Sequence, residues 1–190
     1  MQNVAIITDG SCDLPNDLVQ KYNIHIAPFQ VIFDSEVFKL FGDSGDITKE
    51  EFYDRLVNGP IFPSTAVPTP KSFLDAFEKA SKEAKSVIAI FLSKELSGTI
   101  QSALRVVPMI ENADITVVDS KASASALGLI VLDAAQLAVN GATKDEILER
   151  LNEIIPQTRL VLTLNTMEYL YRGGRKNREG KEALRSSIKH

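Results

Sequence analysis

Continuous apolar runs alternate with amphipathic segments along most of this chain. Four runs have the pattern of buried strands, over residues 4–8, 87–92, 115–118 and 160–164. Uninterrupted apolar strands are typical of a parallel sheet that is covered on both faces. Between these runs, apolar side chains recur at helical spacing over residues 70–84, 123–140 and 143–155. The alternation predicts an α/β fold, with a mostly parallel sheet flanked by helices.

The part of the chain before residue 70 has a less regular pattern. We expect a second strand over residues 24–33, and Pro28 within it indicates an edge strand or an irregular one. Residues 34–46 are rich in Gly, Asp and Ser, and this composition predicts a loop. Residues 59–70 contain four prolines, so we expect a stiff loop without regular structure there.

The C-terminal end of the chain differs in charge from the rest. Residues 172–190 contain seven Lys or Arg and two Glu, a local charge of +5, which leaves −9 for residues 1–171 of a chain whose net charge is −4. We therefore expect an α/β lobe over residues 1–171, followed by a basic helical tail over residues 172–190. The tail is either a solvated helix or a docking surface for an acidic partner.

Composition narrows the class of protein. The 190 residues are enough for one domain with a real core, and 44% hydrophobic and 24% charged residues are ordinary globular values. No apolar run approaches the length of a membrane span, and we identify no signal peptide. The single cysteine, Cys12, excludes an internal disulfide framework and favours a reducing cytoplasm. The net charge of −4 argues against general nucleic-acid binding.

The familiar catalytic patterns are absent from the sequence. There is no Gly-x-Gly-x-x-Gly, and Gly174 and Gly180 have the wrong spacing for a phosphate-binding loop. His25 and His190 are not spaced as metal ligands, and His25 fits best as a structural residue of a strand. No nucleophile and base can be paired from the sequence. We therefore expect a protein that is not an enzyme and that uses no metal or cofactor.

Small hydroxyl residues follow the strand predicted at residues 87–92. Ser97, Gly98 and Thr99 stand where this strand gives way to a helix, whose first backbone N–H groups lack intrahelical partners. With the helix dipole, the two hydroxyls form a neutral anion-binding site, although an ordinary helix cap has the same sequence. We expect Ser64 and Thr65, held by the proline-rich loop, to converge on the same anion.

Polar residues also follow two other predicted strands, those over residues 4–8 and 115–118. Asp9 follows residues 4–8, and Asp119 and Ser120 follow residues 115–118. The carboxyl ends of parallel strands meet at one edge of a sheet, where open α/β sheets bind ligands. We expect these three residues to support the binding pocket and its loops. For Asp9, a purely structural role in fixing the next loop is an equally good interpretation.

The chemistry of these candidates favours a ligand with a small charge and a long apolar part. Neutral hydroxyl and N–H donors, without a committed Arg or Lys, suit a monocarboxylate better than a multiply charged phosphate. Burial of an acyl tail contributes roughly 0.8 kcal/mol per methylene. Ten methylenes would give about 8 kcal/mol, enough for micromolar binding before ordering costs. The head group then needs only to orient the ligand.

Several short motifs, in this order and spacing, resemble the DegV family across essentially the whole chain. They are Thr8-Asp9-Gly10-Ser11-Cys12-Asp13-Leu14-Pro15, Pro63-Ser64-Thr65-Ala66-Val67-Pro68, Leu96-Ser97-Gly98-Thr99-Ile100-Gln101-Ser102-Ala103, Val118-Asp119-Ser120-Lys121, Glu168-Tyr169-Leu170 and Gly173-Gly174-Arg175. The resemblance implies a bacterial fatty-acid-binding protein, the B subunit of a fatty acid kinase. Such a protein presents the carboxylate of a long-chain fatty acid to a kinase subunit, which forms an acyl phosphate for phospholipid synthesis.

The resemblance also implies roles for individual residues. Thr65 and Ser97 would bind the carboxylate, with Gly98 and Thr99 beside them, whereas Arg175, with Arg172 nearby, would face the kinase. The sequence departs from the family pattern where Thr-Ser-Gln-Pro becomes Thr65-Ala66-Val67-Pro68, and where Gly10 replaces a serine after Asp9. The first of these departures removes one hydroxyl and one amide near the head group.

The resemblance further implies that family members continue into a second lobe that closes over the acyl chain. We expect this chain to be the first lobe without that lid, which favours weak binding, self-association through the exposed pocket, or a partner that completes it. Two alternatives to a fatty-acid-binding module stay open. One is an enzyme that uses Asp9 or Asp119. The other is a scaffold or regulatory remnant that docks a partner through its basic tail and binds no lipid.

Overall fold

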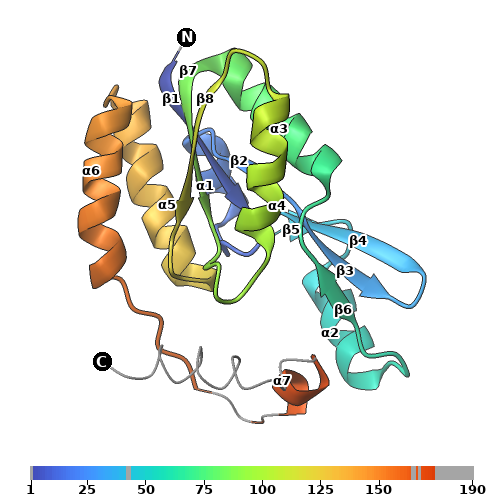
Figure 1. Cartoon of the computed structure of the whole chain (residues 1–190). Coiled ribbons are helices and arrows are strands. Elements are labelled where there is room, and N and C mark those ends of the chain that lie inside the picture. Colours follow the sequence, from blue (N-terminus) through green and yellow to red (C-terminus); the bar gives the residue numbers. More distant parts are fainter. Residues whose placement is uncertain (1, 42–43, 164–165, 167, 174–190) are drawn as a thin grey trace.

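The chain forms two sheets and the helices that pack on them in the computed structural model, which describes residues 2–41, 44–163, 166 and 168–173 (Figure 1). The first sheet has the strand order β2-β1-β7-β8, and all neighbouring strands are parallel. Its strands are β1 (Gln2–Asp9), β2 (His25–Ala27), β7 (Ala84–Phe91) and β8 (Asp114–Asp119). The predicted α/β fold with a parallel sheet flanked by helices is confirmed.

Helices cover both faces of this sheet (Figure 1). Side chains of α3 (Pro70–Glu83) and α4 (Thr99–Val106) pack on one face; those of α5 (Ala124–Val139), α6 (Lys144–Ile154) and α1 (Asn16–Lys21) pack on the other. Short 3-10 turns, η1 (Val107–Met109) and η2 (Ile155–Gln157), follow α4 and α6. Along β1, Val4 and Ile6 join the core beside α5, and Ala5 and Ile7 join the core beside α3. Both faces of β1 are buried, which explains its unbroken apolar run.

The second sheet is antiparallel and was not predicted. Its strand order is β5-β4-β3-β6, from β3 (Phe29–Phe33), β4 (Glu36–Phe41), β5 (Ser44–Gly45) and β6 (Ser64–Ala66). Helix α2 (Lys49–Asn58) packs on it through Phe52, which meets the ring of Phe33 edge to face at 6.0 Å. Figure 1 shows this sheet and α2 projecting from the side of the parallel sheet.

Three expectations for residues 24–70 were wrong in part. The strand predicted over residues 24–33 is two strands of different sheets, because Pro28 has no N–H to donate and separates β2 from β3. The segment predicted as a loop contains the strands Glu36–Phe41 and Ser44–Gly45, because Asp34 takes a left-handed turn conformation with φ 55° and β4 then pairs with β3. The proline-rich segment contains a strand of three residues, β6, which pairs with β3.

The strand predicted over residues 160–164 is also wrong for its described part. Residues 158–163 have no regular structure, and the side chain of Val161 is 88% exposed. An apolar run becomes a strand only where a neighbouring strand accepts its hydrogen bonds, and none of the described strands pairs with this segment. The chain continues to α7 (Glu168–Arg172). Most of the predicted basic tail, residues 174–190, lies outside the described residues.

Candidate functional site

The carboxyl ends of β1, β7 and β8 meet at one edge of the parallel sheet, and Asp9 links two of them. Its carboxylate accepts hydrogen bonds from the backbone N–H groups of Ser11 and Leu92, at 2.9 and 2.8 Å, and from the Ser11 hydroxyl. Asp9 is fully buried, and this burial raises the pKa of its carboxyl although the hydrogen bonds oppose the shift. Both oxygens are engaged by the protein, so the structure favours the structural interpretation of Asp9.

The loop after β8 is tied to the loop after β7. The carboxylate of Asp119 accepts hydrogen bonds from the backbone N–H groups of Lys94 and Lys121, at 3.3 and 3.0 Å. The backbone N–H of Ser93 donates to the carbonyl of Ala122 at 3.0 Å. Ser120 is buried, and its hydroxyl donates to that same carbonyl at 3.2 Å. These bonds fix the loop that leads into the Ser97 turn.

The hydroxyl groups of Ser97 and Thr99 lie 2.8 Å apart at the amino end of α4. Thr99 is fully buried, whereas Ser97 is half-buried, and the Thr99 N–H donates to the Ser97 oxygen at 3.3 Å. Each hydroxyl has one hydrogen to donate, and only one of the two is needed for the bond between them. If Thr99 donates to Ser97, the Ser97 hydroxyl is left to donate to a ligand, where the helix dipole favours an anion. Apart from Gly98 and its two chain neighbours, no atom of the described residues lies within 4 Å of the position that a Cβ would take on Gly98, so the turn is open there.

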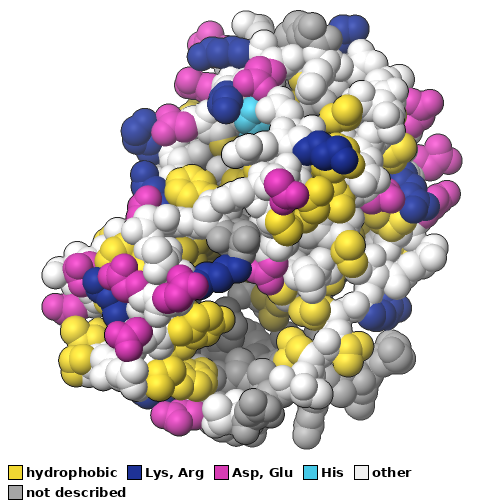
Figure 2. Space-filling model, turned by 180° about the vertical axis from the view of Figure 1, so that it is seen from behind, with side chains coloured by type: hydrophobic (Ala, Val, Ile, Leu, Met, Phe, Trp, Pro, Cys, Tyr) yellow, Lys and Arg dark blue, Asp and Glu magenta, His cyan; other side chains and the backbone are white. Residues whose placement is uncertain are grey.

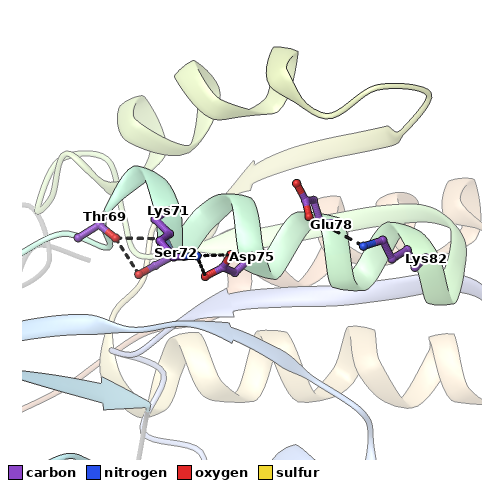
Figure 3. Close-up of polar contacts among 6 residues, drawn as sticks. All are labelled: Thr69, Lys71, Ser72, Asp75, Glu78 and Lys82. Atoms are coloured by element: carbon purple, nitrogen blue, oxygen red, sulfur yellow. Dashed lines mark hydrogen bonds and ion pairs between the residues drawn. The ribbon is translucent and has the colours of Figure 1, made fainter.

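Ser64 and Thr65 lie on β6, at the edge of the second sheet. In the antiparallel register, Thr65 lies opposite Val31 and Ser64 opposite Ile32, and both hydroxyl residues are exposed. After β6 the chain turns into α3 at Thr69, whose hydroxyl accepts a hydrogen bond from the backbone N–H of Ser72 at 3.1 Å (Figure 3). This cap fixes the chain four residues beyond Thr65.

The structure thus places the candidate donors in two groups on different sheets. Ser97, Gly98 and Thr99 follow the parallel sheet, whereas Ser64 and Thr65 lie on the antiparallel one. Among the described residues, no hydrogen bond joins the two groups. Two surface hollows, of about 470 and 320 Å³, are lined by residues that belong to neither group. Within the described part of the chain, no three His, Cys, Asp or Glu side chains lie close enough together to form a metal-binding group.

Helix α7 carries one of the two arginines expected to face a partner. The guanidinium of Arg172 lies 4.4 Å from the centre of the Phe62 ring, and the Glu168 carboxylate pairs with it at 3.2 Å. Nearly half of the Arg172 side chain is exposed. Arg175, the other arginine, lies outside the described residues.

Sequence reasoning missed two close approaches near these groups. A Cβ on Gly10, just beyond β1, would lie 2.1 Å from the carbonyl oxygen of Leu40 on β4, so a side chain there meets backbone of the second sheet. Phe62, two residues before Ser64, stacks on Tyr169 of α7. A glycine after a strand is a weak signal of close packing, and nothing in the sequence links two aromatic residues so far apart.

Large apolar side chains are exposed on the part formed by α2 and the second sheet. Val37, Tyr53 and Val57 are each more than half exposed. Figure 2 shows hydrophobic side chains mixed with acidic and basic ones over this part of the surface. Among the described residues, none of the helices combines the length and the apolar character needed to cross a membrane.

Known proteins resemble this chain over most of its length. It is 40% identical over 178 residues to a DegV domain-containing protein of Caldanaerobacter subterraneus, an alignment that covers 94% of this chain and 62% of that protein. The chain therefore spans less than two thirds of such relatives. In structure it matches a Thermus thermophilus DegV family protein described as binding fatty acid, with a TM-score of 0.80, 31% identity, and coverage of 92% of this chain and 61% of the other.

A second solved structure, that of DegV from Bacillus subtilis, is described as a fatty acid binding protein. It matches with a TM-score of 0.79 and 29% identity, over 92% of this chain and 61% of that one. The family model for the uncharacterised DegV proteins matches residues 3–179. These residues include the two groups of hydroxyls and the loops that support them. The chain therefore belongs to the DegV family.

Proposed function

We propose that this protein binds a long-chain fatty acid, with Thr65 and Ser97 as hydrogen-bond donors to the carboxylate. The observation that carries the proposal is the hydroxyl pair of Ser97 and Thr99 at the amino end of α4, at the carboxyl edge of the parallel sheet. Ser64 and Gly98 stand beside these donors. Family members of similar structure from Thermus thermophilus and Bacillus subtilis are described as binding fatty acids.

The charges near the Ser97 turn fit a ligand with a single negative charge. The nearby ammonium group of Lys94 lies 3.9 Å from the carboxylate of Asp119, which offsets its charge. The remaining donors of the turn are hydroxyl and backbone N–H groups, which orient a carboxylate without the charge needed to neutralise a phosphate. In this proposal the acyl tail supplies most of the binding free energy, as apolar burial does generally.

Asp9, Asp119 and Ser120 have a supporting role in the proposal. Each engages backbone groups of the loops that follow the parallel strands, and together they hold the Ser97 turn against the sheet. None of the three needs to act as an acid or a base. We therefore propose a binding protein that is not itself a catalyst and that needs no cofactor beyond its fatty acid ligand.

We further propose that the bound carboxylate is presented to a fatty acid kinase subunit, which forms an acyl phosphate for phospholipid synthesis. Support comes from the sequence resemblance alone, which gives the kinase-facing role to Arg172 and Arg175. A reducing cytoplasm suits the single cysteine, Cys12, whose burial raises the pKa of its thiol to about 11. Self-association through the exposed pocket is a further part of the proposal, because uncovered apolar surface favours association.

Native mass spectrometry of the purified protein, followed by organic extraction, tests the proposed function. The expected result is a co-purifying fatty acid of one or two chain lengths, or a 1:1 adduct when oleate or palmitate is added. A protein that is empty and takes up neither fatty acid would contradict the proposal. If such a protein bound a partner in a salt-sensitive way, the scaffold interpretation would replace it.

A further inference from the structure

The loop before β6 is held by α7 through one aromatic ring. The rings of Phe62 and Tyr169 are stacked, with centres 6.1 Å apart and planes at 21°. Arg172 lies over the Phe62 ring at 4.4 Å, so Phe62 contacts two residues from successive parts of the same short helix. Stacked aromatic rings and a cation over a ring both attract beyond the burial of their surface.

This ring stands close to the proposed head-group site. Phe62 precedes Thr65 by three residues, and Pro63 between them restricts the backbone. Among the described strands, β6 lies at the edge of its sheet and pairs with β3 alone, through three residue pairs. The Thr69 cap on α3 fixes the chain beyond β6. Phe62 is therefore the anchor on the N-terminal side of Thr65.

We propose that Phe62 is a positioning residue for Thr65, and that α7 clamps the proline-rich loop through it; this rests on the proposed function. Thr65 is exposed on a short edge strand, so its hydroxyl keeps a fixed position only if both ends of β6 are held. The contact of Tyr169 and Arg172 with Phe62 holds one end. Without it, the Thr65 hydroxyl samples more positions and the carboxylate binds less tightly.

The same contact links partner binding to ligand binding. Arg172 is an arginine that we expect to face a partner, and it rests on the ring that positions Thr65. A partner that binds the Arg172 guanidinium therefore weakens its contact with Phe62. Conversely, a ligand that orders β6 strengthens the contact between Phe62 and Arg172. Such coupling between two sites is reciprocal by thermodynamic necessity.

A double-mutant cycle on the whole 190-residue protein tests this inference, with oleate as the probe. Phe62→Ala and Tyr169→Ala each remove the stacked pair, and we expect each to raise the Kd for oleate about three- to tenfold. The double variant should bind about as weakly as the weaker single variant, because both changes break one contact. Phe62→Tyr keeps the ring and should restore most of the affinity. Tyr53→Ala removes an exposed ring of α2 that contacts Phe52 and is the matched control, with no change expected.

Hydrogen exchange adds a readout that does not depend on the ligand. In Phe62→Ala, amides of residues 64–66 and 168–172 should both exchange faster, whereas those of β7 should not change. If the wild type binds oleate and both alanine variants bind it within twofold of the wild type, the clamp is refuted and the proposed function stands. Effects that multiply independently in the double variant refute it as well. If the wild type binds no oleate, the proposed function fails, and with it the positioning role.

Discussion

The carboxylate of Asp9, at the end of β1, accepts a hydrogen bond of 2.8 Å from the backbone N–H of Leu92, just beyond β7. The other oxygen accepts a hydrogen bond from the Ser11 N–H. An amide in place of the carboxylate would therefore place its NH₂ group, a donor, against one of these two N–H donors. We expect Asp9→Asn to lower the free energy of unfolding by about 1–3 kcal/mol, measured by urea titration. Asp133→Asn, which breaks an exposed ion pair with Arg150, should cost under about 1 kcal/mol. Equal stability of the two variants would contradict this role.

Removal of the Ser97 hydroxyl should weaken the binding of a fatty acid without unfolding the domain. We expect Ser97→Ala to cost about 1–2 kcal/mol in oleate affinity, measured by calorimetry, because one donor to the carboxylate is lost. Ser102→Ala, three residues further along α4 from Thr99, is the matched control and should bind as the wild type does. An unchanged affinity in Ser97→Ala would show that the head group lies elsewhere.

Gly10 should not tolerate a side chain, because β4 lies against it. The nearest atom to an added Cβ is the Leu40 carbonyl oxygen at 2.1 Å, which is backbone and can move only if the two sheets shift. We expect Gly10→Ala to lower the free energy of unfolding by about 1–3 kcal/mol. In the ligand-free protein, Gly98→Ala adds a methyl group to open space and should change stability by less than about 0.5 kcal/mol. Denaturant titrations of both variants check the difference, and equal losses would contradict the close approach.

His25 should make stability depend on pH. Its side chain is buried, and Nε2 lies 3.2 Å from the carboxylate of Glu83, which accepts a hydrogen bond from the Asn23 side chain. Burial lowers the pKa of His25 below 6.5, and Lys79 adds to this, while Glu83 opposes it. The unfolded chain therefore takes up the proton first, and stability falls as the pH falls below about 6.5.

Urea titrations between pH 7.5 and 5.5 check this dependence. The slope for one proton is at most about 1.4 kcal/mol per pH unit. His25→Gln should flatten the curve in that range, whatever its effect on total stability. The Asn23 hydrogen bond also lowers the pKa of Glu83 from 4.5, so its contribution is lost only at lower pH. A wild type and a His25→Gln variant with the same slope would contradict the assignment.

The sequence predicted the parallel sheet well because its strands are buried on both faces. It predicted the second sheet poorly, because β4 is flanked by Asp, Ser and Gly residues whose composition is typical of loops. Residues 160–163 show the opposite error, since their apolar side chains favour a strand but no partner strand is present among the described residues. Hydrogen-bond partners in space decide such cases, and they cannot be read from a local pattern.

For the candidate site too, some features could be predicted from the sequence and others could not. The place of Ser97 and Thr99 at a strand-to-helix turn could be predicted from the sequence, because small hydroxyl residues are typical of such turns. The loop support from Asp9 was anticipated as one of two interpretations, and its hydrogen bonds agree with the structural one. The contact of Phe62 with Tyr169 joins residues far apart in the chain, so only the structure could show it. The roles of Ser97, Thr99 and Thr65 in ligand binding, and of Arg172 and Arg175 toward a partner, stay predictions.

The most direct test of the account is carbon-13 NMR of oleate labelled at its carboxyl carbon and bound to the whole protein. The account predicts one bound carboxylate resonance, distinct from free and micellar oleate. Its chemical shift should change in both Thr65→Ala and Ser97→Ala, because each variant removes a hydrogen-bond donor to that carboxylate. Ser102→Ala should leave the resonance where it is. Absence of a bound resonance, or a shift that both variants leave unchanged, would contradict the central claim.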